Sequence, residues 1–283
     1  MEKTFAILGG DKRQLSLLDQ LKEIGYKVYL YGFGSKESEE DLNSVLKLSK
    51  FIVFPMPISK NKKDLYAPFS TRSIPLVEII KNKKLKNKII FTPGLSEDEI
   101  DYSKLIKENK IFKYCTEELL VENAKLTAKA TLKIIKENLK EGLKNKKTLI
   151  CGFGRLGKAL CKILRNKFLD LTVSARKGLD FKEIERLSLN YISTSEIKDQ
   201  YNYDLIINTI PALIFDESTL KATAQNSLLI DLASNPGGVD KIAAKKLKIN
   251  FIHALGLPGK FYPEESAKTI KENILKSIEK PGG

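Results

Sequence analysis

Three glycines with the spacing G-x-G-x-x-G lie where a run of apolar and β-branched residues gives way to a helix-like segment. Gly152 permits a tight turn, Gly154 lets the backbone approach a pyrophosphate, and Gly157 lets the helix pack closely on the sheet. The amides of the helix N-terminus add hydrogen-bond donors for an anion. The pattern predicts a dinucleotide-binding loop, which also contains Phe153, Arg155 and Leu156. Arg155 is either a contact to the pyrophosphate or a solvent-exposed charge.

The end of the next predicted strand indicates which dinucleotide would bind. In NAD-binding versions of this loop, an Asp or Glu roughly 20 residues onward accepts a hydrogen bond from the ribose 2′-hydroxyl. This chain has Val173-Ser174-Ala175-Arg176-Lys177 there, without an acid. Ser174 can donate a hydrogen bond to a 2′-phosphate, Arg176 can bind it through its planar fork, and Lys177 adds a positive charge. The sequence therefore favours NADPH or NADP⁺ over NAD. The alternative is that Arg176 and Lys177 are solvated loop charges.

Three further segments are expected at the carboxyl edge of the same sheet, where open α/β folds bind ligands. They are Asn208-Thr209-Ile210-Pro211, the run from Asp231 to Gly238, and Gly256-Leu257-Pro258-Gly259. Small residues and prolines at strand ends can bring backbone close to a nicotinamide, although they also make ordinary turns. The candidate cofactor contacts in these segments are Asn208, Thr209, Pro211, Ser234, Pro236, Gly237 and Gly238.

A second glycine turn, Gly9-Gly10, also follows a strand and opens a helix. It places an acid, a base and an amide together as candidate catalytic or substrate-binding residues: Asp11, Arg13 and Gln14. Arg13 and the helix N-terminus could hold a substrate carboxylate. Asp11 is a candidate base or orienting group, but capping of the helix would by itself explain an aspartate at this position.

Strand-like runs alternate with amphipathic stretches along the chain. The predicted strands of the first half are Thr4–Gly10, Lys27–Phe33, Phe51–Pro57, Lys88–Gly94 and Ile111–Cys115. Those of the second half are Thr148–Gly152, Leu171–Arg176, Asn190–Ser193, Asp204–Thr209, Ser227–Ser234 and Asn250–Leu255. A helix from Lys12 to Ile24 and a longer one from Glu117 to about Lys140 are predicted from apolar residues every three or four positions. The fold class is therefore α/β, with two doubly wound parallel-sheet domains joined by a long helix, the second a Rossmann domain.

The predicted domain boundaries follow from this order of elements. We expect a substrate domain at residues 1–118, a bridging helix at 119–142, a Rossmann NADP-binding domain at 143–262 and a C-terminal helical segment at 263–283. The last helix, from about Pro263 to Ile278, is expected to fold back onto the first domain.

The composition argues against several other classes of protein. The net charge of +14 invites nucleic-acid binding, but the lysines are interleaved with glutamates rather than with aromatic residues, so no nucleic-acid partner is expected. No run approaches the roughly 18 to 20 apolar residues of a membrane span, and the N-terminus lacks a signal-peptide pattern, so we expect a cytoplasmic protein. Three cysteines without a CxxC pair and the single His253 predict reduced thiols and no metal site. His253 lies in an apolar run, which favours packing over catalysis.

Taken together, the Gly9–Gln14 turn, the Gly152–Gly157 loop and the three segments between Asn208 and Gly259 resemble the dipicolinate synthase A subunit over nearly the whole chain. The resemblance implies an architecture similar to that of the 2-hydroxyacid and alanine dehydrogenases. It also implies NADP⁺-linked oxidation of a dihydrodipicolinate-type intermediate to dipicolinate in sporulating bacteria. Members of this family work with a flavoprotein-like B subunit. A homo-oligomer is compatible with this interpretation.

The bridging helix departs from the family pattern Asn-Ala-x-Pro-Thr-Ala-Glu-Gly. Asn123 and Thr127 match this pattern and are candidates for the substrate cleft, whereas Lys129 stands where the family has a glutamate. If that carboxylate handles substrate, this chain has an altered substrate or a weaker activity.

The substrate implied by the resemblance is a small ring dicarboxylate, which needs cationic or amide anchors. Arg13, Gln14 and the amides near Ser234–Gly238 could provide them. Two other hypotheses stay open: an NADPH-dependent dehydrogenase of another amino, imino or hydroxy acid, and a non-catalytic NADPH-binding partner protein, which the lack of an obvious catalytic histidine allows.

Overall fold

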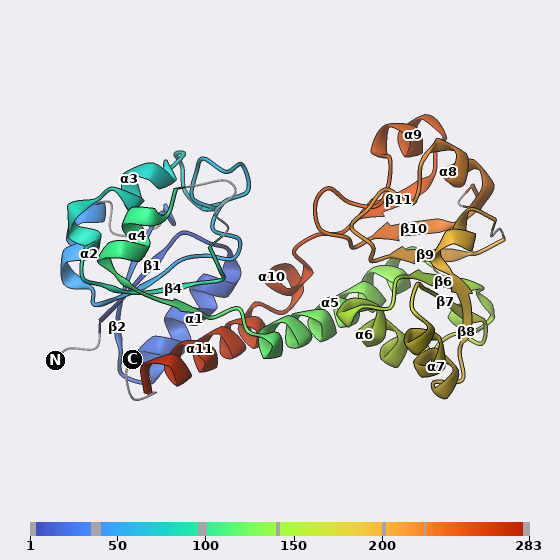
Figure 1. Cartoon of the computed structure of the whole chain (residues 1–283), viewed down its shortest axis with the longest axis horizontal. Helices are drawn as coiled ribbons and strands as arrows, with labels where there is room; N and C mark the ends of the chain where they lie inside the picture. The colour runs from blue at the N-terminus through green and yellow to red at the C-terminus, as the bar shows by residue number, and fades with distance from the viewer. Residues whose placement is uncertain are drawn as a thin grey trace. The chain divides into compact units, whose positions relative to one another are not determined.

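The computed structural model describes residues 4–34, 41–95, 101–139, 142–199, 202–223 and 225–279. The chain divides into unit 1, Met1–Glu122 with Gly259–Gly283, and unit 2, Asn123–Pro258. Each unit is built on its own parallel sheet (Figure 1). Helix α5 (Glu117–Asn138) carries the chain from unit 1 into unit 2. The predicted α/β class with two parallel-sheet domains is confirmed.

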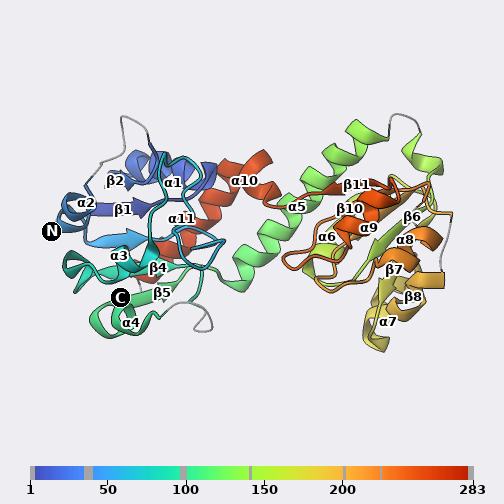
Figure 2. The same cartoon turned by 90° about the horizontal axis from the view of Figure 1, so that it is seen from above.

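Unit 1 contains five parallel strands in the order β2-β1-β3-β4-β5, of which β1, β2, β4 and β5 are labelled in Figure 2. Their bounds are β1 (Thr4–Leu8), β2 (Lys27–Tyr31), β3 (Phe51–Val53), β4 (Ile89–Thr92) and β5 (Lys110–Lys113). In β1, Phe5 and Ile7 belong to one buried cluster, while Ala6 and Leu8 belong to another. Successive side chains of a strand point to opposite faces, so both faces of this sheet are covered.

Helices of unit 1 supply the other half of each cluster. One face is covered by α1 (Lys12–Glu23) and α11 (Pro263–Glu279), which also pack against each other. The other face is covered by α2 (Leu42–Leu48), α3 (Leu76–Ile80), the short 3₁₀ helix η1 (Lys83–Leu85) and α4 (Ser103–Glu108). The C-terminal helix is thus part of the core of unit 1.

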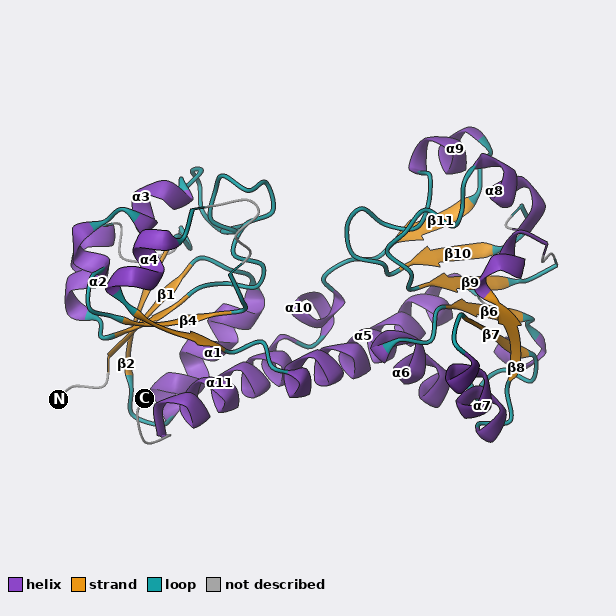
Figure 3. Cartoon of the chain, viewed as in Figure 1, coloured by secondary structure: helices purple, strands orange, loops and turns teal. Residues whose placement is uncertain are grey.

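Unit 2 contains six parallel strands in the order β11-β10-β9-β6-β7-β8, which can be followed in Figure 3. Their bounds are β6 (Thr148–Cys151), β7 (Leu171–Ala175), β8 (Asn190–Ser193), β9 (Leu205–Asn208), β10 (Leu228–Asp231) and β11 (Asn250–His253). The short helix η2 (Leu143–Asn145) precedes β6. The helices between the strands are α6 (Arg155–Leu164), α7 (Gly178–Arg186), η3 (Thr194–Asp199), α8 (Glu217–Thr223) and α9 (Lys241–Lys246), and α10 (Leu257–Phe261) follows β11. The chain runs outward from β6 in one direction through β7 and β8, then in the other through β9 to β11. The strand order therefore reverses beside β6, where open α/β sheets bind their ligands.

Most strands end one to three residues before their predicted ends, and at some of them a glycine turns the backbone. β1 ends at Leu8 since Gly9 and Gly10 have φ of +58° and +110°, and β6 ends at Cys151 since Gly152 has φ of +97°. The predicted long helix is confirmed as far as Asn138. Its expected end at Lys140 lies outside the described residues. Among the described helices, none has the length and apolarity that crossing a membrane requires.

Candidate functional site

The turn between β6 and α6 has the geometry that its glycines predict. A Cβ atom on Gly157 would lie 2.0 Å from the carbonyl oxygen of Gly152, so only glycine allows α6 to approach the strand this closely. A Cβ atom on Gly154, by contrast, would meet nothing within 4 Å. The backbone is therefore tightly packed behind the turn and open beside Gly154, where a pyrophosphate would lie.

The N-terminus of α6 is open to an external anion. Its N-cap is Gly154, which offers no capping side chain, and its first turn contains no acidic residue. The first amides of a helix have no partner within the helix and carry a partial positive charge. Gly154 and Arg155 are exposed, Leu156 is half-buried and Phe153 is buried. The residues present fit a bound pyrophosphate, because donors and space coincide at this end of α6.

Side chains from neighbouring strands hold the glycine turn from behind. The Gly152 amide donates to the backbone oxygen of Ser174 at 3.2 Å and to its hydroxyl oxygen at 3.1 Å. Thr209 donates its hydroxyl to the Cys151 carbonyl oxygen at 2.8 Å, and a Cβ atom on Gly152 would lie 2.6 Å from that hydroxyl. The turn, β7 and the end of β9 therefore form one hydrogen-bonded group.

Ser174 lies elsewhere than its predicted role requires. Its side chain is fully buried and accepts a hydrogen bond from the glycine turn, so it supports the loop from within the sheet. Arg176 and Lys177, just beyond the end of β7, are exposed. Within the described part of the chain neither makes an ion pair. These two cations remain available for a 2′-phosphate.

The segments after β9 and β10 contain both buried and exposed residues. Asn208, Gly237 and Gly238 are buried, and Thr209 is half-buried. The exposed predicted contacts are Pro211, Ser234 and Pro236. The amide of Gly237 donates to the Ser234 carbonyl oxygen at 2.8 Å, which closes the turn. The structure therefore brings these predicted residues together at the carboxyl edge of unit 2, on the side of β6 away from Arg176.

The corresponding turn of unit 1 is closed by its own side chains. Asp11 caps α1 by accepting from the Arg13 amide, and the Gln14 side chain accepts from the Asp11 amide. The guanidinium of Arg13 donates twice to the Asp11 carboxylate, at 2.8 Å each, and also to the Met56 carbonyl oxygen. The capping role of Asp11 is therefore present, and Arg13 is already charge-balanced.

The ion pair between Asp11 and Arg13 is largely buried. Only 9% of the Arg13 side chain and 17% of the Asp11 side chain are exposed. Burial by itself would lower the pKa of Arg13, but the hydrogen bonds and the charge of Asp11 outweigh it, so the pKa stays above its ordinary value. Gln14 is also buried, and its amide nitrogen has no acceptor in the described part of the chain. Gln14 therefore carries the one buried donor of this turn that a ligand oxygen could satisfy.

Two polar residues on α5 lie one helical turn apart. The hydroxyl of Thr127 donates to the Asn123 carbonyl oxygen at 2.7 Å, and both residues are half-buried. Lys129, the residue at which the sequence departs from the expected pattern, is exposed. Asn123 and Thr127 share a face of α5, while their proposed contact with substrate stays a prediction.

Sequence reasoning overlooked residues whose partners are distant in the chain. Tyr114 is fully buried, donates its hydroxyl to the Phe54 carbonyl oxygen at 3.0 Å, and lies in the electrostatic environment of Arg13. Desolvation raises the pKa of this phenol far above its ordinary value, so it stays protonated. His253 stacks on Phe251 with ring centroids 6.3 Å apart, in keeping with the packing role expected for it.

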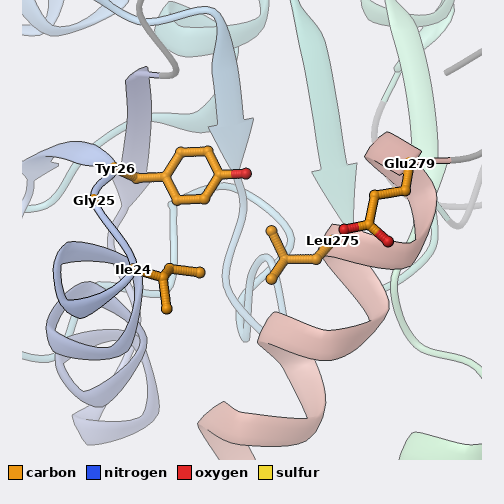
Figure 4. Close-up of a pocket in the computed structure, with 5 residues that line it drawn as sticks. All are labelled: Ile24, Gly25, Tyr26, Leu275 and Glu279. Carbon is orange, nitrogen blue, oxygen red and sulfur yellow. The ribbon is translucent and has the colours of Figure 1, made fainter.

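A small cavity of about 210 Å³ lies at a different place in unit 1 (Figure 4). It is lined by Ile24, Gly25, Tyr26, Leu275 and Glu279. Its volume is below the roughly 300 Å³ from which ligand pockets usually begin, and no predicted site residue lines it. We do not regard it as the functional site.

Comparison with known proteins finds similarity to the dipicolinate synthase A subunit in the N-terminal domain and over the whole chain. Residues 4–114 match the family model described as the N-terminal domain of the dipicolinate synthase A subunit. Over 283 aligned residues the chain is 25% identical to the dipicolinate synthase A subunit of Bacillus subtilis (strain 168), covering 96% of this chain and 94% of that one. The crystal structure of the dipicolinate synthase A subunit from Bacillus halodurans has a TM-score of 0.84 at 24% identity and 99% coverage of both chains.

The fold is also that of nicotinamide-dependent dehydrogenases. NAD-dependent formate dehydrogenase from Staphylococcus aureus, solved in complex with NAD, matches with a TM-score of 0.56 at 15% identity, covering 98% of this chain and 94% of that one. The predicted resemblance is confirmed: this chain resembles the dipicolinate synthase A subunit in its N-terminal domain and along nearly its whole length.

Proposed function

We propose that this protein is an NADP-dependent oxidoreductase of the dipicolinate synthase family, corresponding to its A subunit. The observation that carries the proposal is the N-terminus of α6, where open space beside Gly154 coincides with a helix end that has no capping side chain. A pyrophosphate supplies the negative charge that such a helix end favours. The dehydrogenase fold supports a pyridine nucleotide as the coenzyme.

The preference for NADP over NAD rests on the end of β7. Arg176 and Lys177 are exposed there, and no acid occupies the position that would accept a bond from a ribose 2′-hydroxyl. A guanidinium binds a phosphate through two parallel hydrogen bonds, whereas a carboxylate would repel it. Ser174 acts in this proposal through the Gly152 amide rather than on the phosphate.

The proposed substrate is a dihydrodipicolinate-type ring dicarboxylate, oxidised to dipicolinate during sporulation. The bound coenzyme would accept the hydride, and aromatisation of the ring would supply much of the driving force. In unit 2, Asn123, Thr127 and the exposed turn from Ser234 to Pro236 would anchor and orient the ring. In unit 1, the buried side-chain amide of Gln14 would donate to a ligand oxygen. Asp11 would hold Arg13 in place, since its carboxylate is committed to that guanidinium.

A titration with reduced coenzymes tests the nucleotide assignment. The wild-type protein should bind NADPH more tightly than NADH, and Arg176→Ala should lower the NADPH affinity roughly tenfold or more while changing the NADH affinity less than twofold. Arg186→Ala, which removes an exposed arginine from the last turn of α7, is the matched control and should leave both affinities unchanged. Equal affinities for the two coenzymes in the wild type would contradict the proposal.

An assay of turnover distinguishes the proposed substrate from the alternatives. Reduced-nicotinamide absorbance is followed with NADP⁺ and a dihydrodipicolinate-type substrate, with and without the flavoprotein-like B subunit that we propose as partner. Formation of NADPH supports the proposal. Turnover only with another amino, imino or hydroxy acid would select a different dehydrogenase. Tight NADPH binding without turnover of any of these would select a non-catalytic nucleotide-binding protein.

A further inference from the structure

Asp231, the last residue of β10, is a fully buried carboxylate at the carboxyl edge of unit 2. One of its oxygens accepts from the Asn208 side-chain amide at 2.9 Å and from the Ala233 backbone amide at 3.1 Å. The other accepts from the Gly238 backbone amide at 3.2 Å. One side chain therefore joins the end of β9, the residues after β10 and the far end of the following turn.

Asn208 extends this connection into the segment after β9. Its amide nitrogen donates to the Ile210 carbonyl oxygen at 3.1 Å, and its side-chain oxygen accepts from the Ile210 amide at 3.1 Å. A Cβ atom on Gly238 would lie 2.0 Å from the Asn208 side-chain nitrogen, so the two segments pack together without a gap. The shape of residues 208–211 and of residues 233–238 thus depends on a single buried hydrogen-bond network.

All three groups that face the Asp231 carboxylate are hydrogen-bond donors. A carboxylate offers only acceptors, so every contact is satisfied. An asparagine of the same size would turn an NH₂ group toward one of these donors and leave a buried polar group unpaired, which costs about 1–3 kcal/mol. Few side chains can replace Asp231 without changing the backbone around it.

The strand order indicates which part of the coenzyme this network serves. Residues 208–211 and 233–238 follow β9 and β10, on one side of β6, whereas Arg176 and Lys177 follow β7 on the other. A dinucleotide that lies across the strand-order reversal places its two nucleosides on opposite sides of the central strand. If the 2′-phosphate lies beside β7, the nicotinamide half lies over the segments that Asp231 holds.

We propose that Asp231 is a positioning residue that shapes residues 208–211 and 233–238 to receive the nicotinamide half of the coenzyme. This inference rests on the proposed NADP site. It acts through Asn208 and Gly238 rather than by touching the coenzyme, because it is fully buried. Its effect is therefore selective for ligands that carry the nicotinamide.

Binding of NADPH is compared with binding of adenosine 2′,5′-bisphosphate, which lacks the nicotinamide half. Asp231→Asn should weaken NADPH binding roughly tenfold or more and change binding of the bisphosphate by less than about twofold. Asp204→Asn is the matched control, because Asp204 precedes β9 at the amino edge of the same sheet and accepts from the Lys147 amide at 2.8 Å. That variant should show no selective loss of NADPH.

Binding of the bisphosphate also reports whether Asp231→Asn folds. If that variant does not fold, Asn208→Ala keeps the two backbone donors to Asp231 and should show the same selective loss with a smaller magnitude. The inference is overturned if the folded variant binds NADPH like the wild type, or if it loses both ligands equally. A wild-type protein that binds neither ligand would instead overturn the proposed function.

Discussion

The two units each contain a strand, a glycine turn and a helix, but the two helix ends are satisfied in opposite ways. At α1 the chain supplies its own anion: Asp11 caps the helix and pairs with Arg13. At α6 the N-cap is Gly154, which has no side chain, and no acid stands in the first turn. Because both helices present the same partly positive amides, only the α6 end is left without an anion from its own first turn or cap, as the proposed pyrophosphate site requires.

The glycines differ in the same sense. The Cβ of an alanine at Gly157 would meet the backbone of Gly152, which cannot move without displacing β6. The Cβ of an alanine at Gly10 would meet the buried Gln14 side chain, whose oxygen accepts from the Asp11 amide in the cap of α1. At these two positions, the substitution is therefore opposed by backbone in unit 2 and by the capping side chain of Gln14 in unit 1.

The largest effect is expected from a variant that disrupts the closed turn, the turn between β1 and α1 in which Asp11 pairs with Arg13. Asp11→Ala should lower the free energy of unfolding by about 3 kcal/mol, because it leaves the buried Arg13 guanidinium unpaired and removes the cap of α1. Chemical denaturation measures the change. Asp19→Ala, an exposed aspartate on the same helix, should change stability by less than about 0.5 kcal/mol. The double variant Asp11→Ala with Arg13→Met should recover part of the loss. Equal stabilities of Asp11→Ala and Asp19→Ala would refute the view that unit 1 closes its own turn.

The next largest effect is expected on coenzyme binding at the open turn, the glycine turn between β6 and α6. Gly157→Ala should weaken NADPH binding by roughly 100-fold, because the 2.0 Å approach to the Gly152 carbonyl oxygen forces α6 away from β6. Gly10→Ala is the counterpart in unit 1, and its positive φ makes it costly for stability by about 1–2 kcal/mol. It should nevertheless leave NADPH affinity unchanged. Calorimetric titration measures the NADPH affinity of both variants, and thermal melting checks that they fold. An equal loss of NADPH affinity in both would mean that the two turns do not differ in role.

The open turn could be predicted from local spacing, whereas the closed one could not. The positions of Gly152, Gly154 and Gly157 within six residues carry the whole signal, and the structure has the turn there. The Arg13 guanidinium also donates to Met56, 43 residues away, and Asp231 binds Asn208 across 23 residues. Contacts of that kind arise only once the sheet is assembled, so the pattern Gly-Gly-Asp-x-Arg-Gln left both a cap and an anion anchor open.

Strand register explains why the direction of the Ser174 side chain could not be predicted. All five residues of β7 are buried, so alternation of polar and apolar residues could not show which way the hydroxyl points. The expected direct bond from Ser174 to a 2′-phosphate followed from its place near the strand end. In the structure the register with β6 pairs Cys151 with Ser174, and the hydroxyl meets the Gly152 amide instead. The fold class was accessible from periodicity, but the direction of a single buried side chain was not.

Ser174→Ala should have the smallest effect of the three, and it separates support of the turn from recognition of the coenzyme. The glycine amide of unit 1 donates to the Tyr31 carbonyl oxygen, whereas that of unit 2 is shared between the carbonyl oxygen and the hydroxyl of Ser174. Because the backbone acceptor survives the substitution, the free energy of unfolding should fall by only about 1 kcal/mol. The ratio of NADPH to NADH affinity should stay as in the wild type, since the buried hydroxyl does not reach the adenosine ribose in this arrangement. A variant that keeps its stability but loses its preference for NADPH would indicate that Ser174 binds the 2′-phosphate directly. It would also mean that the turn between β6 and α6 needs less support from β7 than its hydrogen bonds indicate.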